Sequence, residues 1–371
     1  MMGAILAMGV VASLKAETLF EALAIAYATS PSLQAARAAV RSSDEGVPQA
    51  LAGWRPTVSL NSSVGLQKSK TNVIREQDLV PRTYSADLSQ SLYAGGRTVA
   101  STAQAKSNVL LARAQLKAAE QNVLSTGVTA FLGVLRDQAR VQLTINNELV
   151  LRRQLEATRD RFEVGEVTRT DVAQGEARLS GVIANRVDAE GDLASSRASY
   201  RQIFGAKPEI LQPAPPLPNL PATEAEALAI AEAENPSIAV ALQQEAVAHH
   251  GVGDAKGRLL PTVDLTGRAR RADETSTENS DSQSYSVVAS ISIPLYQAGA
   301  VHALVRQSKE LLNQRRIEVE ETRREVIKAA SQAWERMTTT RSQIAARSEA
   351  IRANEIALEG VRQEAEVGSR T

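Results

Sequence analysis

The chain contains two related halves of about 200 residues each. Matching segments lie 205 residues apart near the start of each half and 203 residues apart further along. The matches are Glu21–Ala26 with Glu226–Ala231, Pro31-Ser32 with Pro236-Ser237, Pro56–Val58 with Pro261–Val263, Leu92-Tyr93 with Leu295-Tyr296, Gly96 with Gly299, and Glu163–Gly165 with Glu366–Gly368. So long a period indicates a duplicated structural half and not a solenoid unit. The sequence therefore predicts one architecture built from two copies.

The repeat also predicts the domain organisation. Residues 1–16 resemble the remnant of a signal peptide, with an apolar run that ends near Ala16. The first repeat is expected over 17–206, a proline-rich linker over 207–221, and the second repeat over 222–371. Because Thr371 corresponds to Thr168, we expect the second repeat to lack its final helix and the natural protein to continue.

The composition argues against several classes of function. Lys+Arg and Asp+Glu both number 42, so the chain lacks the net positive charge that would indicate nucleic-acid binding. The absence of cysteine excludes thiol catalysis, thiolate metal sites and disulfides. The three histidines are scattered, and no nucleophile–base pair, phosphate-binding loop or metal-ligand cluster is present. We therefore expect no enzyme activity, no cofactor and no metal.

Four segments alternate between apolar and polar residues, as strands with two different faces do. They are expected at about 57–68, 83–93, 262–270 and 285–295. Each has roughly the length that a tilted strand needs to cross a bilayer. An ordinary half-buried antiparallel sheet would give the same alternation. The polar face consists mainly of Ser, Thr, Asn, Gln and Asp, which would suit a water-filled lumen.

The rest of each half is predicted to be helical. Thr18 with Glu21, and Thr223 with Glu226, have the spacing of capping boxes. Two stretches without proline, about 97–162 and 300–365, predict helices on the order of 100 Å long. A returning helix is expected at about 168–204. Helices of this length must pack laterally on similar helices, as in a coiled coil.

Four strands cannot close a membrane barrel, because the smallest known barrels need about eight. Open strand edges in lipid leave backbone groups unpaired, at a cost of several kcal/mol each. Strands in a membrane would therefore require a barrel shared between chains. Three chains would supply twelve strands, and their helices would form a hollow cylinder. The expected fold is an α+β membrane protein in which a shared barrel continues into a helical tube that acts as a conduit.

These features together resemble the TolC family of outer-membrane factors. The resemblance covers the whole chain, from Glu21–Ala26 through Leu92–Gly96 to the two Val-Gly segments. It implies a homotrimer with a twelve-stranded barrel in outer-membrane lipid and a helical tunnel in the periplasm. It also implies two protein partners, a periplasmic adaptor (membrane fusion protein) and an inner-membrane pump driven by ATP (the ABC type) or by protons. The opening segment, Glu17–Leu23, is more similar to members that serve type I protein secretion than to dedicated drug-efflux members.

The resemblance also implies a gate at the periplasmic tips. The first tip contains Gly165, Thr170 and Asp171, and the second contains Gly368 and Arg370. Thr170 and Asp171 would accept hydrogen bonds from Arg370, since a guanidinium fork forms a strong but reversible contact with a carboxylate. The family's tyrosine partner falls at Ala365. Taken without the resemblance, Asp171 would be a helix cap and Arg370 a solvated surface charge.

Aromatic and glycine residues mark the ends of the strands. Trp54 precedes the first strand, while Tyr93 and Tyr296 are expected to end the second strand of each half. All three would lie at the periplasmic edge of the barrel as membrane-interface anchors. Packing at the turns is the alternative for these aromatics. The expected strand-to-helix turns contain Gly95, Gly96 and Gly299.

One alternative function remains open on these residues. A periplasmic coiled-coil adaptor or scaffold protein without a barrel would share the helical hairpins. Such a protein would not need four strands of matched length with a hydroxyl-rich face.

Overall fold

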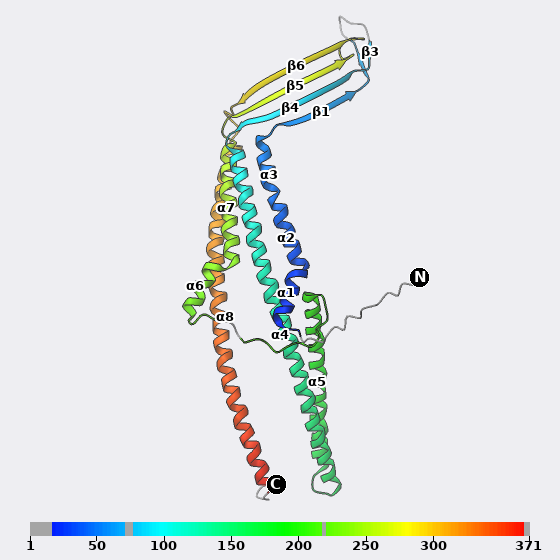
Figure 1. Cartoon of the computed structure of the whole chain (residues 1–371), viewed down its shortest axis with the longest axis vertical. Helices are drawn as coiled ribbons and strands as arrows, with labels where there is room; N and C mark the ends of the chain where they lie inside the picture. The colour runs from blue at the N-terminus through cyan, green and yellow to red at the C-terminus, as the bar shows by residue number, and fades with distance from the viewer. Residues whose placement is uncertain (1–16, 71–76, 217–219, 367–371) are drawn as a thin grey trace, which may run out of the picture. The chain divides into compact units, whose positions relative to one another are not determined.

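The computed structural model describes residues 17–70, 77–216 and 220–366 and has an α+β fold. Long helices are combined with one four-stranded antiparallel sheet and a small two-stranded hairpin (Figure 1). The chain divides into two compact units. One contains residues up to Ala38 together with Leu116–Asn219, and the other contains Ala39–Gln115 and the chain from Leu220 onward. Each unit thus combines segments that are distant in the sequence.

Helices make up most of the first unit. α1 (Leu19–Thr29) begins with a complete capping box, in which the side chain of Thr18 and that of Glu21 each bond the other residue's backbone N–H. α2 (Pro31–Asp44) and α4 (Arg97–Glu163) each contribute to both units. α5 (Arg169–Phe204) returns alongside the distal part of α4 (Figure 1).

The core of the first unit lies where α1, α4 and α5 meet. Phe131 and Val134 of α4 are fully buried there. The rings of Tyr200 and Phe204 pack against each other at a tilt of 36°, with centroids 4.3 Å apart. The Tyr200 hydroxyl donates a 2.7 Å hydrogen bond to Glu17. Burial raises the pKa of Tyr200 above its ordinary value, and the Glu17 carboxylate raises it further.

The second unit contains the main sheet. Its strands are β1 (Thr57–Val64), β4 (Arg82–Ala94), β5 (Thr262–Asp273) and β6 (Asp281–Ser292), in the order β1-β4-β5-β6. All three pairings are antiparallel. Two strands therefore come from each repeat, and the repeats meet at the central β4–β5 pairing.

Helices flank the ends of these strands. α3 (Gly46–Leu51) and a short 3₁₀ helix (Ala52–Trp54) lead into β1. α6 (Glu224–Glu234) and α7 (Pro236–Gly257) precede β5, and α8 (Ala300–Glu366) follows β6. α7 and α8 pack side by side (Figure 1).

The helix caps of α6 and α7 are partly as expected. Thr223 accepts the backbone N–H of Glu226, but the Glu226 carboxylate bonds Ala222 N. The predicted capping box at this helix is therefore only half formed. Asn235 caps α7 through Ser237 N at 2.8 Å.

The strand ends differ from the expected ones where a residue breaks the ladder. β1 stops at Val64, because the next residue, Gly65, donates its N–H to the Pro81 carbonyl but Pro81 has no N–H to return. β2 (Gln67–Ser69) pairs instead with β3 (Gln77–Leu79). β6 extends from Asp281 to Ser292, against an expected 285–295. Pro294 has no N–H to offer a ladder, which explains the earlier end.

Candidate functional site

The main sheet has one apolar face, and that face is exposed. Its cross-strand register places Val58, Leu88, Gly267 and Val287 in one row and Leu60, Ala86, Ala269 and Tyr285 in the next. Leu60 is 82% exposed and Tyr285 is 80% exposed. A soluble protein seldom leaves such a surface in water, so this face requires an apolar environment.

The opposite face is polar and carries few charges. One row contains Ser59, Asp87, Arg268 and Ser286. The Asp87 carboxylate accepts hydrogen bonds from Asn61 at 3.1 Å and Ser85 at 2.9 Å, and it pairs with the guanidinium of Arg268. Asp87 is therefore fully satisfied by its neighbours. A face of this kind suits water and dissolved cargo.

Both edges of the sheet lack a strand partner among the described residues. β1 pairs only with β4, and β6 pairs only with β5. Unpaired edges expose backbone N–H and C=O groups that another strand can bond. The sheet is therefore built to continue into a further strand at either side.

The predicted interface aromatics have three different environments. Trp54 ends the 3₁₀ helix before β1, and its carbonyl accepts a 3.2 Å hydrogen bond from Gln90. Tyr93 lies at a bulge in the β4–β5 ladder. Tyr296 does not end a strand as expected, because β6 ends at Ser292 and Tyr296 lies in the connection to α8. All three side chains are exposed.

Sequence reasoning did not single out the aromatic pair at the other end of the sheet. Tyr84 and Tyr285 are exposed on the apolar face, one row apart, close to the loop ends of β4 and β6. Arg271 lies in the same row as Tyr84, and the next row on this face towards the loops pairs Arg82 with Asp273. Aromatic residues at the border between apolar and polar rows were the available signal.

Glycines occupy the turns from strand to helix. Gly95 and Gly96 have φ values of +64° and +77°, and Gly299 has +80°. A Cβ atom at Gly95 would lie 2.2 Å from the Gly257 carbonyl oxygen, so no other residue fits there. Ala298 occupies the position equivalent to Gly95 in the second repeat and also has a positive φ, +48°.

The turn between α4 and α5 forms the first predicted tip. Gly165 has a φ of +83°, and its N–H bonds the Phe162 carbonyl at 3.0 Å. Thr168 then caps α5, with Asp171 as its capping-box partner. The Asp171 carboxylate accepts from Thr168 N at 2.9 Å and from Thr168 Oγ1 at 2.8 Å. These bonds, the backbone one first, hold the pKa of Asp171 below its ordinary value.

Within this tip, Thr170 lies exposed in the first turn of α5, next to Asp171. Gly368 and Arg370 lie outside the described residues. The geometry therefore places Asp171 in a helix cap, with one carboxylate oxygen, Oδ2, engaged by Thr168.

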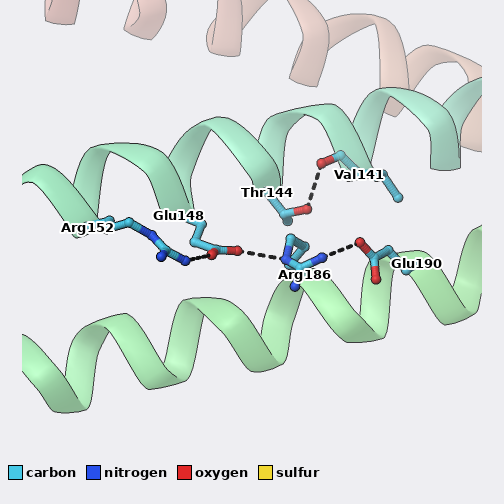
Figure 2. A network of polar contacts seen from close by, with 6 residues as sticks. All are labelled: Val141, Thr144, Glu148, Arg152, Arg186 and Glu190. Carbon is cyan, nitrogen blue, oxygen red and sulfur yellow. Dashed lines mark hydrogen bonds and ion pairs between the residues drawn. The ribbon is translucent and has the colours of Figure 1, made fainter.

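An ionic network joins α4 to α5 further along the hairpin (Figure 2). Glu148 accepts from Arg152 at 2.5 Å and from Arg186 at 2.7 Å, and Arg186 also bonds Glu190 at 2.5 Å. Hydrogen bonding by Arg152, and then by Arg186, holds the pKa of Glu148 below its ordinary value. The i,i+4 spacing of Glu148 and Arg152 was visible in the sequence, whereas the bond to Arg186 depends on the hairpin register.

A buried carboxylate lies in the same α4–α5 hairpin, closer to the C-terminal end of α5. Asp137 is 2% exposed and receives two hydrogen bonds from Arg136, at 2.8 and 3.0 Å, and one from Ser196. The guanidinium of Arg136 holds the pKa of Asp137 below its ordinary value, and the hydroxyl of Ser196 contributes in the same direction. The carboxylate therefore stays ionised and links the two helices.

Over residues 17–70, 77–216 and 220–366, no three His, Cys, Asp or Glu side chains gather as metal ligands. None of the helices in these ranges has the length and apolar character of a membrane span.

Comparison with known proteins identifies the architecture. Residues 22–206 and 227–371 match the family described as outer membrane efflux protein. The chain belongs to this outer membrane efflux protein family. Outer membrane efflux protein BepC of Brucella suis biovar 1 is 35% identical over 96% of this chain and 77% of its own length. Outer membrane protein TolC of Vibrio cholerae is 26% identical over 96% of this chain and 82% of its own.

Solved structures give the same fold. A crystal structure of CusC aligns with a TM-score of 0.80 at 17% identity, over 95% of this chain and 83% of the other. As an outer membrane efflux protein of the TolC type, the chain is a transport channel of the outer membrane with a periplasmic helical extension, and not an enzyme. The alternative of a coiled-coil adaptor without membrane strands does not fit a family match that includes both strand pairs.

Proposed function

We propose that three copies of this outer membrane efflux protein form a closed, twelve-stranded barrel. The observation that carries the proposal is the four-stranded sheet with two open edges, an exposed apolar face and a hydroxyl-rich face. Pairing β6 of one copy with β1 of the next would satisfy every edge, as lipid requires. The apolar face would then contact lipid and the polar face would line the lumen.

The proposed role follows from this assembly. The helices would continue the lumen as a tube through the periplasm, toward a periplasmic adaptor and an inner-membrane pump. Transport through the channel would be passive, with the pump supplying the energy. The cargo would be a secreted protein or small molecules delivered by that pump.

The closed barrel is tested by disulfide cross-linking. Because the sequence contains no cysteine, only the introduced cysteines can form disulfides. Ser286→Cys on β6 is combined in turn with Ser59→Cys or Asn61→Cys on β1, and oxidised in outer membranes. A covalent trimer is expected for at least one pair. The matched control is Ser89→Cys with Thr266→Cys, which face each other within one chain and should give only an internal cross-link. Detergent-extracted protein with the mass of a single chain would contradict the proposal.

We further propose that the helical tips form the gate. Arg370 would contact Thr170 and Asp171 from a neighbouring tip, alongside Gly165 and Gly368. Asp171 Oδ2 is engaged by the Thr168 cap, so the latch would use the other oxygen, Oδ1. Arg370→Ala should raise single-channel conductance in planar bilayers, while Arg169→Ala, which removes a charge from the same region, should leave it unchanged. Equal conductance in Arg370→Ala and unmodified channels would refute the latch.

A further inference from the structure

The polar face of the sheet carries four charged side chains in its ladder rows, two paired and two unpaired. Asp87 and Arg268 neutralise each other in one row. Asp264 lies nearer the helical end, between Ser91 and Ser290, and Arg270 lies nearer the loops, between Ser85 and Ser284. Neither Asp264 nor Arg270 has a charged partner in the described part of the chain.

We propose that Asp264 and Arg270 form two rings of opposite charge in the lumen, so that the barrel conducts ions asymmetrically. The inference rests on the proposed trimer, in which each residue occurs three times around the pore. Three carboxylates would attract cations near the periplasmic end of the barrel. Three guanidinium groups would attract anions near the outer end.

The dimensions of such a barrel let these charges act across the whole lumen. Twelve strands spaced about 4.8 Å apart and tilted about 40° give a radius of about 12 Å from axis to backbone. Asp264 and Arg270 are six residues apart on β5, which is about 20 Å along the strand and about 15 Å along the axis. The Debye length is about 30 Å at 10 mM salt and about 3 Å at 1 M. At low salt each ring therefore acts across the whole pore, and because the Debye length exceeds the spacing of the rings, their opposite fields partly cancel.

Coulomb attraction gives the size of the effect. Three unit charges about 12 Å from the axis in water, screened at 10 mM salt, would alone enrich a monovalent counter-ion on the axis about threefold, and the opposing charges, about 19 Å away, reduce this to about twofold. At 1 M salt the same charges produce almost no enrichment. A pore with a cation-rich zone followed by an anion-rich zone carries unequal currents at opposite voltages. The asymmetry should therefore appear in dilute salt and vanish in concentrated salt.

The test is the ratio of single-channel currents at equal positive and negative voltages. Protein is added to one side of a planar bilayer, and the ratio is measured channel by channel in 10 mM and 1 M KCl. Asp264→Asn with Arg270→Gln should bring the 10 mM ratio closer to one, and Asp264→Arg with Arg270→Asp should shift it in the opposite sense. The matched control, Asp87→Asn with Arg268→Gln, removes a neutral pair and should preserve the wild-type ratio.

The outcomes separate this inference from the proposed function. Channels whose 10 mM ratio is the same in wild type, neutralised and swapped variants would overturn the two-ring arrangement while leaving the channel intact. A shift in the neutral-pair control as large as in the neutralised variant would overturn it too. Failure of the wild-type protein to form any channel would instead contradict the proposed function.

Discussion

Leu155→Ala should loosen the α4–α5 hairpin locally. Leu155 is 5% exposed, and Gly175 of α5 lies opposite it, where an added Cβ would be 2.9 Å from Leu155 Cδ1. Truncation of a buried leucine to alanine costs about 3 kcal/mol when the site cannot collapse. Since 1.36 kcal/mol corresponds to a factor of ten, amide hydrogen exchange near the contact should accelerate roughly 150-fold.

A second substitution at the same contact makes the reasoning refutable. Gly175→Ala alone should be nearly neutral, because the contact with a flexible leucine methyl is offset by about 1 kcal/mol of helix propensity. In Leu155→Ala/Gly175→Ala the new methyl enters the cavity, so about 1 kcal/mol or more should be recovered. Exchange is followed by mass spectrometry on peptides covering 150–180. Unchanged exchange in Leu155→Ala, or additive effects in the double variant, would show that this contact does not hold the hairpin.

Three further variants are expected to change stability or its pH dependence. Tyr200→Phe removes the hydroxyl that bonds Glu17 and should lower stability by about 1–2 kcal/mol, seen as a lower thermal midpoint. Because the pKa of Tyr200 is raised in the fold, the neutral hydroxyl contributes to the stability of the folded state below about pH 10, and this contribution is lost as the pH rises. The thermal midpoint of Tyr200→Phe should therefore fall less steeply than that of the wild type from pH 9 to 11.5. Asp137 has a lowered pKa, so its carboxylate contributes to the stability of the folded state above about pH 4, and this contribution is lost as the pH falls. Asp137→Asn should be less stable than the wild type at pH 7, and its stability should depend less on pH in the acid range. Parallel curves of stability against pH for the two proteins would contradict this. Thr168→Ala should lower the stability of the first turn of α5 by about 1 kcal/mol, measured as faster exchange there, whereas Thr170→Ala should not.

Local signals in the sequence were sufficient for most of the elements. The long helices were predicted from helical patterns without proline, and α4 ends within one residue of the expected 162. α8 is helical as far as Glu366, the last residue that the structure describes in this part of the chain. The spacing of Thr168 and Asp171 is that of a capping box, the same signal that located the start of α1, so their contact was open to prediction. The ends of the strands were harder to predict, because Pro81 and Pro294 remove ladder hydrogen bonds that alternation alone does not reveal.

Contacts between distant segments could not be predicted from pattern. Glu148 bonds Arg186, 38 residues away, only because the hairpin turn sets the register between α4 and α5. Asp87 and Arg268 belong to different repeats and meet only in the β4–β5 ladder. The alternation of polar and apolar residues predicts which face of the sheet each residue occupies. The pairing partner of a residue depends instead on the order of the strands in the sheet.

The central β4–β5 pairing has a consequence for the order of folding. The two paired residues of this ladder that are closest in sequence, Ala94 and Thr262, are separated by about 170 residues of chain. The turn between β5 and β6 spans fewer than ten residues. Loop-closure entropy makes this pairing costlier by about 2–3 kcal/mol, and contacts of such high separation form slowly. The two hairpins, β1–β4 and β5–β6, should therefore form first and remain separate, each with unpaired edges, until the helical segments between them have folded. During that interval the chain is most exposed to aggregation, and it is then that a chaperone would have to hold it.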